Sequence, residues 1–156
     1  MSEDNAERAA AAARALLAAE SVGVLSTISV RRAGTPYGSV TPYALSSAGQ
    51  PLLLLSALAA HTHNLRGDPR AGLFVGDHSA AADPQAGARL SLMGRALPVG
   101  DDEAPDARAR YVARWPQATG TLALGDFSFW RFEIEEARFI AGFGEIRWLP
   151  ASAFGG

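Results

Sequence analysis

The sequence predicts a mainly β domain, a barrel or sandwich with a few α-helices at its periphery. Apolar and β-branched segments of strand length alternate with short turn clusters of glycine, proline and serine. Only two or three segments have the composition or periodicity of a helix, and the strand–helix–strand alternation of a parallel sheet is missing. The chain of 156 residues has the usual length of one domain, so we expect a single domain over residues 1–156.

The order of the elements follows from local composition and periodicity. Residues 3–20 are alanine-rich and predict an N-terminal helix, which leaves residues 21–150 for the β core. A second, short helix is expected at 58–66, and a third begins at an N-cap formed by Asp101 or Asp102 and ends at Pro116. Strands are expected at 22–30, 39–45, 51–56, 71–77, 89–97 and 127–134, followed by extended segments at 137–140 and 145–149, with a loop at 78–87 and a glycine break at 142–144.

Composition excludes several classes of function. The chain contains no cysteine, which rules out disulfides, thiolate metal sites and a cysteine nucleophile. All of the basic residues are arginine, so Schiff-base chemistry through lysine is excluded as well. The formal net charge of −2 gives no basic field, and we therefore expect neither nucleic acid nor an anionic membrane as a partner.

The N-terminus and the hydropathy pattern bear on localisation. The first residues are acidic where a secretory signal is basic, and no apolar run reaches the length of a membrane span. With the absence of cysteine, this pattern predicts a cytoplasmic protein that is neither exported nor inserted into a membrane.

The segment from Ser56 to Arg70 carries the clearest signal of chemistry. A buried strand ends in the hydroxyl of Ser56, and a short helix bearing His61, Thr62 and Asn64 begins just beyond it. Free backbone N–H groups at a helix N-terminus favour an anion, and these side chains add hydrogen-bonding groups around it. The segment predicts a phosphate site. The alternative is that Ser56 only caps the turn and the histidines lie on the surface.

A wider set of motifs resembles a known family. The motifs are Gly23-Val24-Leu25-Ser26-Thr27, Gly34-Thr35-Pro36-Tyr37-Gly38-Ser39, the leucine-rich strand ending at Ser56, His61-Thr62-x-Asn64-Leu65-x-x-Asp68-Pro69-Arg70-Ala71, Gly94-Arg95-Ala96, Asp126-Phe127 and Gly142-Phe143-Gly144-x-x-x-Trp148. Together they are similar to the pyridoxamine 5′-phosphate oxidase-related family of flavin mononucleotide (FMN)-binding proteins, and within it most of all to the haem-utilisation branch. The resemblance covers roughly residues 10–150.

The resemblance implies a fold, an assembly and a cofactor. The expected fold is a six-stranded split β-barrel of Greek-key type that forms a homodimer, with FMN held between the subunits. Ser56, His61, Thr62 and Asn64 stand where the family grips the FMN phosphate. A histidine replaces the lysine or arginine that relatives often have near position 61, so phosphate affinity is expected to fall as pH rises.

Three further residues are candidates for contact with the cofactor. Arg89 stands where relatives place a side chain that reaches the cofactor, although a solvated arginine at a strand end explains it equally well. Tyr43 and Trp148 are candidates for lining the ring, or alternatively part of the core. We predict no metal site, because His61 and His63 are two apart in a helix and point away from each other, which leaves His78 unsupported.

The function implied is that of a flavin-dependent oxidoreductase acting on a small molecule that the sequence does not identify. The flavin supplies the redox chemistry, so no catalytic residue is assigned. Alternatives are haem binding with oxidative haem breakdown, a non-catalytic carrier of flavin or tetrapyrrole, and a protein that uses the deazaflavin F420. Relatives in the haem branch have a haem-ligating histidine near their end, whereas this sequence has none after His78. The strand at 127–134 has apolar side chains on both faces, so either a partner subunit or a helix must cover one of them.

Overall fold

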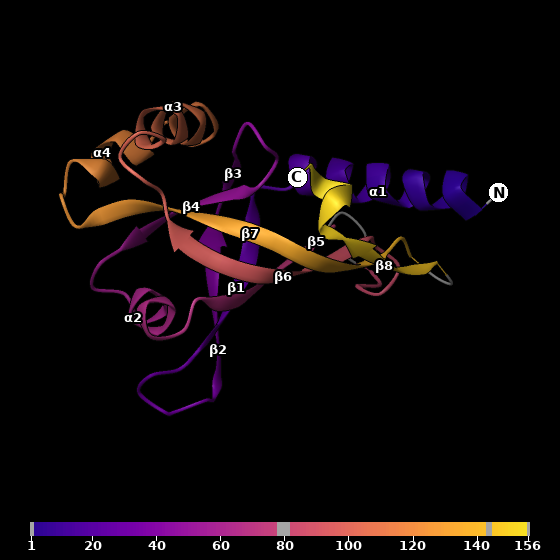
Figure 1. The fold of residues 1–156 in the computed structure, drawn as a ribbon, viewed down its shortest axis with the longest axis horizontal. Helices are drawn as coiled ribbons and strands as arrows, with labels where there is room; N and C mark the ends of the chain where they lie inside the picture. The colour runs from indigo at the N-terminus through magenta and orange to yellow at the C-terminus, as the bar shows by residue number, and fades with distance from the viewer. Residues whose placement is uncertain (1, 78–81, 143–144, 156) are drawn as a thin grey trace.

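One long strand, β7 (Phe127–Ile140), organises the sheet in the computed structural model, which describes residues 2–77, 82–142 and 145–155. Strand β6 (Arg89–Pro98) pairs with β7 along almost its whole length. On its other side β7 pairs first with β4 (Pro51–Ser56) and then with β8 (Ile146–Pro150). The strand therefore links the two ends of the fold (Figure 1).

The remaining strands complete a single antiparallel sheet. Its order is β2-β1-β5-β6-β7-β4-β3, with β8 on the far half of β7. Strands β1 (Val22–Ile28) and β2 (Pro36–Pro42) form the predicted hairpin, and β5 (Arg70–Gly76) joins it to β6. The sheet curls so far that β2, at one edge, comes into contact with β4 near the other. This curled sheet is the predicted split-barrel class.

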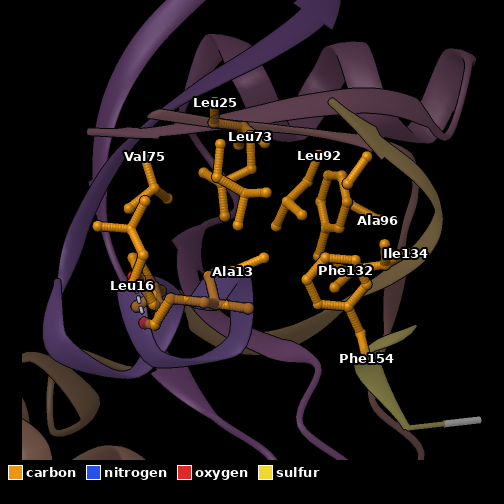
Figure 2. Close-up of a cluster of buried hydrophobic side chains, with 14 of the residues drawn as sticks. Ala13, Leu16, Leu25, Leu73, Val75, Leu92, Ala96, Phe132, Ile134 and Phe154 are labelled. Carbon is orange, nitrogen blue, oxygen red and sulfur yellow. Dashed lines mark hydrogen bonds between the residues drawn. The ribbon is translucent and has the colours of Figure 1, made fainter. Parts of the chain in front are cut away.

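The inside of the curl holds the main core. Side chains alternate along β1, where Leu25 is buried and its neighbours Val24 and Ser26 are exposed, as expected for a half-buried strand. Helix α1 (Ser2–Ala19) packs against this core through the buried stripe Ala9, Ala10, Ala13, Leu16 and Leu17. Figure 2 shows Leu16 of this helix on the side of Val75 and Ala13 between Leu16 and Phe132, while Phe154 of the 3-10 helix η1 (Ala151–Phe154) packs from the C-terminal end.

A second core lies on the opposite face of β4 and β7. Helices α3 (Ala104–Arg114) and α4 (Ala118–Leu122) cover that face, and Tyr111 and Ala118 pack there with Phe129. Strand β4 is consequently buried on both sides, as its unbroken leucine run predicts. The helices, and not a partner subunit, cover this side of β7.

The structure corrects several details of the predicted elements. There are eight described strands where six were expected, because a two-residue strand, β3 (Ala44–Leu45), follows β2, and β8 is added beside β7. Strand β7 also runs unbroken through 133–136, which the sequence suggested was a strand end and turn. Helix α3 begins after Glu103, with no side-chain cap from Asp101 or Asp102, and α4 was not predicted at all.

Parts of two predicted features fall outside the described residues. Residues 78–81 of the predicted loop, and Phe143 and Gly144 of the glycine break, are not described. No helix among the described residues combines the length and the apolar character needed to cross a membrane.

A β-bulge explains how β7 stays in register with β6 over its whole length. The pairing shifts between Met93 and Gly94, which lie opposite Glu136 and Ile134, so Glu135 has no direct partner. The extra residue lets both Ile134 and Ala137 face the core. A Cβ atom at Gly94 would lie 1.8 Å from the carbonyl oxygen of Glu133, so only glycine fits opposite the bulge.

We therefore expect Gly94→Ala to lower the free energy of unfolding by about 3 kcal/mol, because the new methyl group meets backbone that cannot move aside. Gly38→Ala is the matched control, since a Cβ there meets only Val24 Cγ1 at 3.6 Å. The control should change stability by no more than about 0.5 kcal/mol. Urea unfolding followed by circular dichroism measures both, and equal stability of the two variants would show that the bulge does not constrain the fold.

Candidate functional site

Ser56 closes the end of β4 and starts the turn into the next helix. Its hydroxyl donates to an Asp126 carboxylate oxygen at 2.8 Å and accepts from the Leu58 N–H at 3.1 Å. The backbone reinforces this link, because the Ala57 N–H donates to the Asp126 carbonyl at 2.7 Å. Asp126 immediately precedes β7, so these bonds tie the start of the turn to the strand that organises the sheet.

Helix α2 (Ala60–Gly67) presents an N-terminus without a side-chain cap. Its N-cap residue is Ala59, which has extended backbone geometry and makes no capping hydrogen bond. The first N–H groups of a helix have no intrahelical partner, so this end attracts an anion or water. Figure 1 places α2 on the other side of β4 and β7 from α3 and α4.

His61 lies in the first turn of α2 and faces β2. Its Nδ1 is 3.2 Å from the hydroxyl oxygen of Ser39 in β2, a bond whose donor depends on the tautomer of the ring. Burial lowers the pKa of His61 below its ordinary value, because the charged imidazolium loses hydration there. A bound anion would reverse part of that loss by pairing with the protonated ring.

Thr62 is the second predicted residue at this end of α2. It is 1% exposed, and its Oγ1 has no hydrogen-bond partner in the part of the chain that the structure describes. A sealed hydroxyl without a partner costs free energy, and a ligand or a water molecule would reach it only if the side chain turned outward.

Asn64 has a structural role. The side chain is buried, its Oδ1 accepts from the Val30 N–H at 2.9 Å, and its amide nitrogen donates to the Thr27 hydroxyl at 3.0 Å. Both polar atoms are thus used to fasten α2 to the end of β1. The structure does not leave Asn64 free to grip a phosphate as the resemblance implied.

The other three predicted residues lie away from α2. Tyr43 is buried in the main core, where its hydroxyl donates to the Leu17 carbonyl at 2.6 Å and burial raises its pKa. Arg89 is the first residue of β6, and the guanidinium of Arg89 donates to the Gln85 carbonyl at 2.6 Å. In the sheet it lies opposite Gly76, the last residue of β5, whereas α2 precedes the first residue of that strand, Arg70.

Trp148 lies on the edge strand β8 and is 55% exposed. The guanidinium carbon of Arg138 stands 4.9 Å from the centre of its ring, in a cation–π contact. Within one copy of the chain, therefore, Ser56, His61 and Thr62 are the predicted residues that gather at the strand-to-helix turn. The Ser56 hydroxyl is engaged by Asp126 and Leu58 and the Thr62 hydroxyl is sealed, so half-buried His61 is the one that a ligand could contact directly.

An apolar outer face forms the second part of the candidate site. Its members are exposed side chains on the side of the sheet away from the main core: Val24, Val40, Phe74, Met93 and Trp148. Val24 pairs directly with Val40 on one side and with Phe74 on the other, so these three form a row across the strands. The sequence analysis predicted the strands but did not assign this face.

A groove of about 390 Å³ adjoins the outer face at Met93 and is lined by residues of β1, β2, β5, β6 and β7. Gly72 and Met93 line its floor, and Thr27, which accepts the hydrogen bond from Asn64, lies at the α2 side. Arg70 stands at its edge, where its guanidinium pairs with Asp68 and holds the pKa of that carboxyl at about 2. Sequence reasoning missed Ser39 and Arg70 as neighbours of the site, although both belong to the motifs that carried the resemblance.

These residues fit a planar cofactor that carries an anionic group. The uncapped helix end and half-buried His61 suit a phosphate or a carboxylate. A metal held by side chains has less support, since no cluster of three histidine or acidic ligands occurs among the described residues, and His78 lies outside them. A larger cavity of about 580 Å³, between α3, β7 and the turn at 46–50, contains none of the predicted site residues.

Comparison with known proteins identifies the family. The β-barrel model of the CREG family matches residues 4–155. The chain belongs to the CREG β-barrel family. Its resemblance to the FMN-binding split barrels, and to their haem-utilisation branch, is thereby confirmed.

Individual relatives agree with this assignment. The chain is 35% identical over 131 residues to the non-canonical heme oxygenase HOZ of Arabidopsis thaliana, a match that covers 83% of this chain and 39% of that protein. A heme-binding protein from Mycobacterium smegmatis has the same fold with a TM-score of 0.86 and 34% identity, over 94% of this chain and 59% of that one. The chain therefore spans well under two thirds of both relatives.

A more distant structure supports the fold alone. A Clostridium acetobutylicum protein of the pyridoxinephosphate oxidase family superposes with a TM-score of 0.71 at 12% identity, over 95% of this chain and 98% of that one. The split-barrel architecture is thus shared across both the haem-related and the oxidase-related groups.

We expect Asn64→Ala to lower the free energy of unfolding by about 2 kcal/mol, because it leaves the buried Thr27 hydroxyl and the Val30 N–H without their partner. Asn5→Ala, at an exposed position of α1, is the control and should be near neutral. Thermal unfolding measures both variants. An Asn64 variant as stable as the control would mean that the amide does not anchor α2.

Proposed function

We propose that this protein binds haem. The observation that carries the proposal is its similarity, at 34% and 35% identity over most of its length, to proteins whose names record haem binding and haem oxygenase activity. Haem is a planar, largely apolar ring with two carboxylate groups. The apolar outer face suits such a ring, and the N-terminus of α2 with His61 suits one of the carboxylates.

We further propose that two copies of the chain pair through the outer face and enclose the cofactor between them. Val24, Val40 and Phe74 form an exposed apolar row on strands whose other face is already buried, and such contiguous patches favour a partner. Pairing would remove these side chains from water and would seal the groove beside α2. A second copy is the partner that the family resemblance implies.

FMN is the second candidate cofactor, with an oxidoreductase activity on a small molecule. The specific observation in its favour is the combination at α2 of an uncapped N-terminus with half-buried His61, which suits a phosphate dianion. When bound, the flavin would supply the redox chemistry. The residues of this chain would hold the phosphate and keep water from the ring.

An absorbance spectrum of the purified protein, followed by titration with haemin and separately with FMN, tests which cofactor it takes. We expect a Soret band that saturates at one haem per chain or per pair of chains. Tight FMN uptake without haem binding would replace the first proposal by the second. Uptake of neither would contradict both and would leave an interaction module.

His61 should make binding of either anionic group depend on pH. Burial holds the pKa of His61 below its ordinary value of 6.5 when the site is empty, and a bound anion would raise the pKa of His61. The affinity for the anionic ligand should therefore be greatest at pH values below the pKa of His61 in the ligand-free protein. It should decline as pH rises from that pKa to the higher pKa of His61 in the ligand-bound protein, and level off above the second value. His61→Gln should remove most of this dependence, while His63→Gln, at the exposed neighbouring histidine, should keep it.

Fluorescence titrations of FMN and riboflavin, and Soret titrations of haemin, between pH 5 and pH 8 measure the effect. The pH profile of the His61→Gln variant reports the ionisation of each ligand itself and is subtracted from the native profile. Riboflavin lacks the phosphate and should bind without the His61 component. Identical pH profiles for the two histidine variants would place the anion elsewhere.

Phe74→Glu tests the proposed pairing, because it places a charge in the middle of the apolar row. We expect the native chain to elute as a dimer in size-exclusion chromatography with light scattering, and this variant as a monomer. Leu124→Glu makes the same change at an exposed leucine beyond α4, outside the outer face, and should stay dimeric. A monomeric native chain, or a dimeric Phe74 variant, would contradict the pairing.

A further inference from the structure

An aromatic cleft of about 340 Å³ separates helices α3 and α4 from the adjoining ends of β4 and β7. It is defined here by Leu54, Tyr111, Trp115, Gln117, Thr121 and Phe127. Three of these six side chains are aromatic, and the two amide or hydroxyl side chains come from α4 and the turn before it. The volume lies within the range of small-molecule sites in proteins.

Tyr111 brings an unused hydrogen-bonding group to this cleft. The residue is 3% exposed, and its ring packs edge-on against Phe129 with 5.6 Å between the ring centres. Its hydroxyl has no hydrogen-bond partner among the described residues. The described side-chain atoms that are both fully buried and without a partner are Thr62 Oγ1 and Trp130 Nε1, and the Tyr111 hydroxyl is not one of them. The hydroxyl of Tyr111 is therefore not sealed, and the residue lines the cleft.

Trp115 forms a fixed wall of the same cleft. Its indole N–H donates to the Tyr43 carbonyl at 2.9 Å, which holds the ring in place across the boundary between α3 and the sheet. An aromatic ring whose polar atom is already satisfied offers only its apolar surface to a ligand. A flat molecule can stack there without breaking an internal hydrogen bond.

The charges of the lining narrow the ligand further. None of the described residues that line the cleft has an acidic, arginine or histidine side chain. Burial raises the pKa of Tyr111 to about 12, so this group is a neutral donor at physiological pH. A charged ligand would lose its hydration there without gaining a counter-charge, which costs free energy. A neutral ligand has no charge to desolvate and avoids this cost.

We propose that the aromatic cleft is a binding site for a neutral, planar aromatic molecule whose carbonyl oxygen or ring nitrogen accepts a hydrogen bond from Tyr111. The ring of such a molecule would pack between Trp115 and Phe127, and Gln117 and Thr121 would meet its solvent-facing edge. This site is separate from the anion site at α2, and the proposal holds whichever cofactor the protein takes.

Coumarin is a suitable probe, since it is neutral, has two fused rings and carries a carbonyl acceptor. We expect it to bind the purified protein in a titration followed by saturation-transfer NMR. Tyr111→Phe removes only the hydroxyl and should weaken coumarin roughly three- to tenfold, as expected for one lost neutral hydrogen bond. Tyr37→Phe makes the same change at an exposed tyrosine of β2, outside the cleft, and should bind like the native chain.

A second variant keeps the test independent of Tyr111. Thr121→Phe enlarges a half-buried side chain at the edge of the cleft and should abolish coumarin binding by filling it. Thermal unfolding checks that each variant is folded; Tyr111→Phe is expected to be as stable as the native chain because its hydroxyl has no internal partner. Absence of coumarin binding to the native chain, or native affinity in either cleft variant, would overturn the proposal.

Discussion

The ladder between β6 and β7 is the constraint on which the rest of the structure depends. Because β7 has fourteen residues, it pairs with β4 through its first half and with β8 through its second while β6 runs along its other side. The bulge at Glu135 inserts one extra residue into β7 and shifts its register by one position. Apolar side chains before and after the bulge, such as Ile134 and Ala137, therefore both face the main core. Without that correction one half of the strand would turn its apolar side chains to solvent.

The candidate anion site depends on this ladder through two anchors at the ends of the α2 segment. The turn that precedes α2 is tied to Asp126, the residue before β7, through Ser56. The helix itself is tied to the end of β1 through Asn64. Rigid attachment at both places leaves the first turn, with His61 and Thr62, as the part of the segment whose polar groups are not fully used.

The two faces of the sheet are treated differently, and this difference bears on function. Helices α3 and α4 cover the apolar face of β4 and β7, so that face needs no partner subunit. The outer face of β1, β2 and β5 has no such cover in a single copy of the chain, and its exposed row of apolar side chains is the basis of the proposed pairing. The aromatic cleft lies at this helical cover and is lined by residues of α3, α4 and the adjoining parts of β4 and β7.

Local sequence determined much of this protein by itself. Alanine-rich composition identified α1, β-branched residues around a turn cluster identified the β1–β2 hairpin, and an unbroken apolar run identified the doubly buried β4, because each depends on neighbours within a few positions. The motif from Ser56 to Arg70 was correctly expected to place a hydroxyl and a histidine where a strand passes into a helix. Its resemblance to the split barrels was also sufficient to identify the fold class and the family.

Only the tertiary structure decided what each polar side chain does there. Asn64 and His61 lie three positions apart on one helix, yet Asn64 bonds Thr27 and Val30 whereas His61 faces Ser39, because the two side chains meet different strands of the β1–β2 hairpin. Tyr43, Arg89 and Trp148 were separated from the site for the same kind of reason: strand pairing sets which distant residues meet. Hydrophobic periodicity specifies the face of a strand on which a side chain lies, but it carries no information about which strand lies beside it.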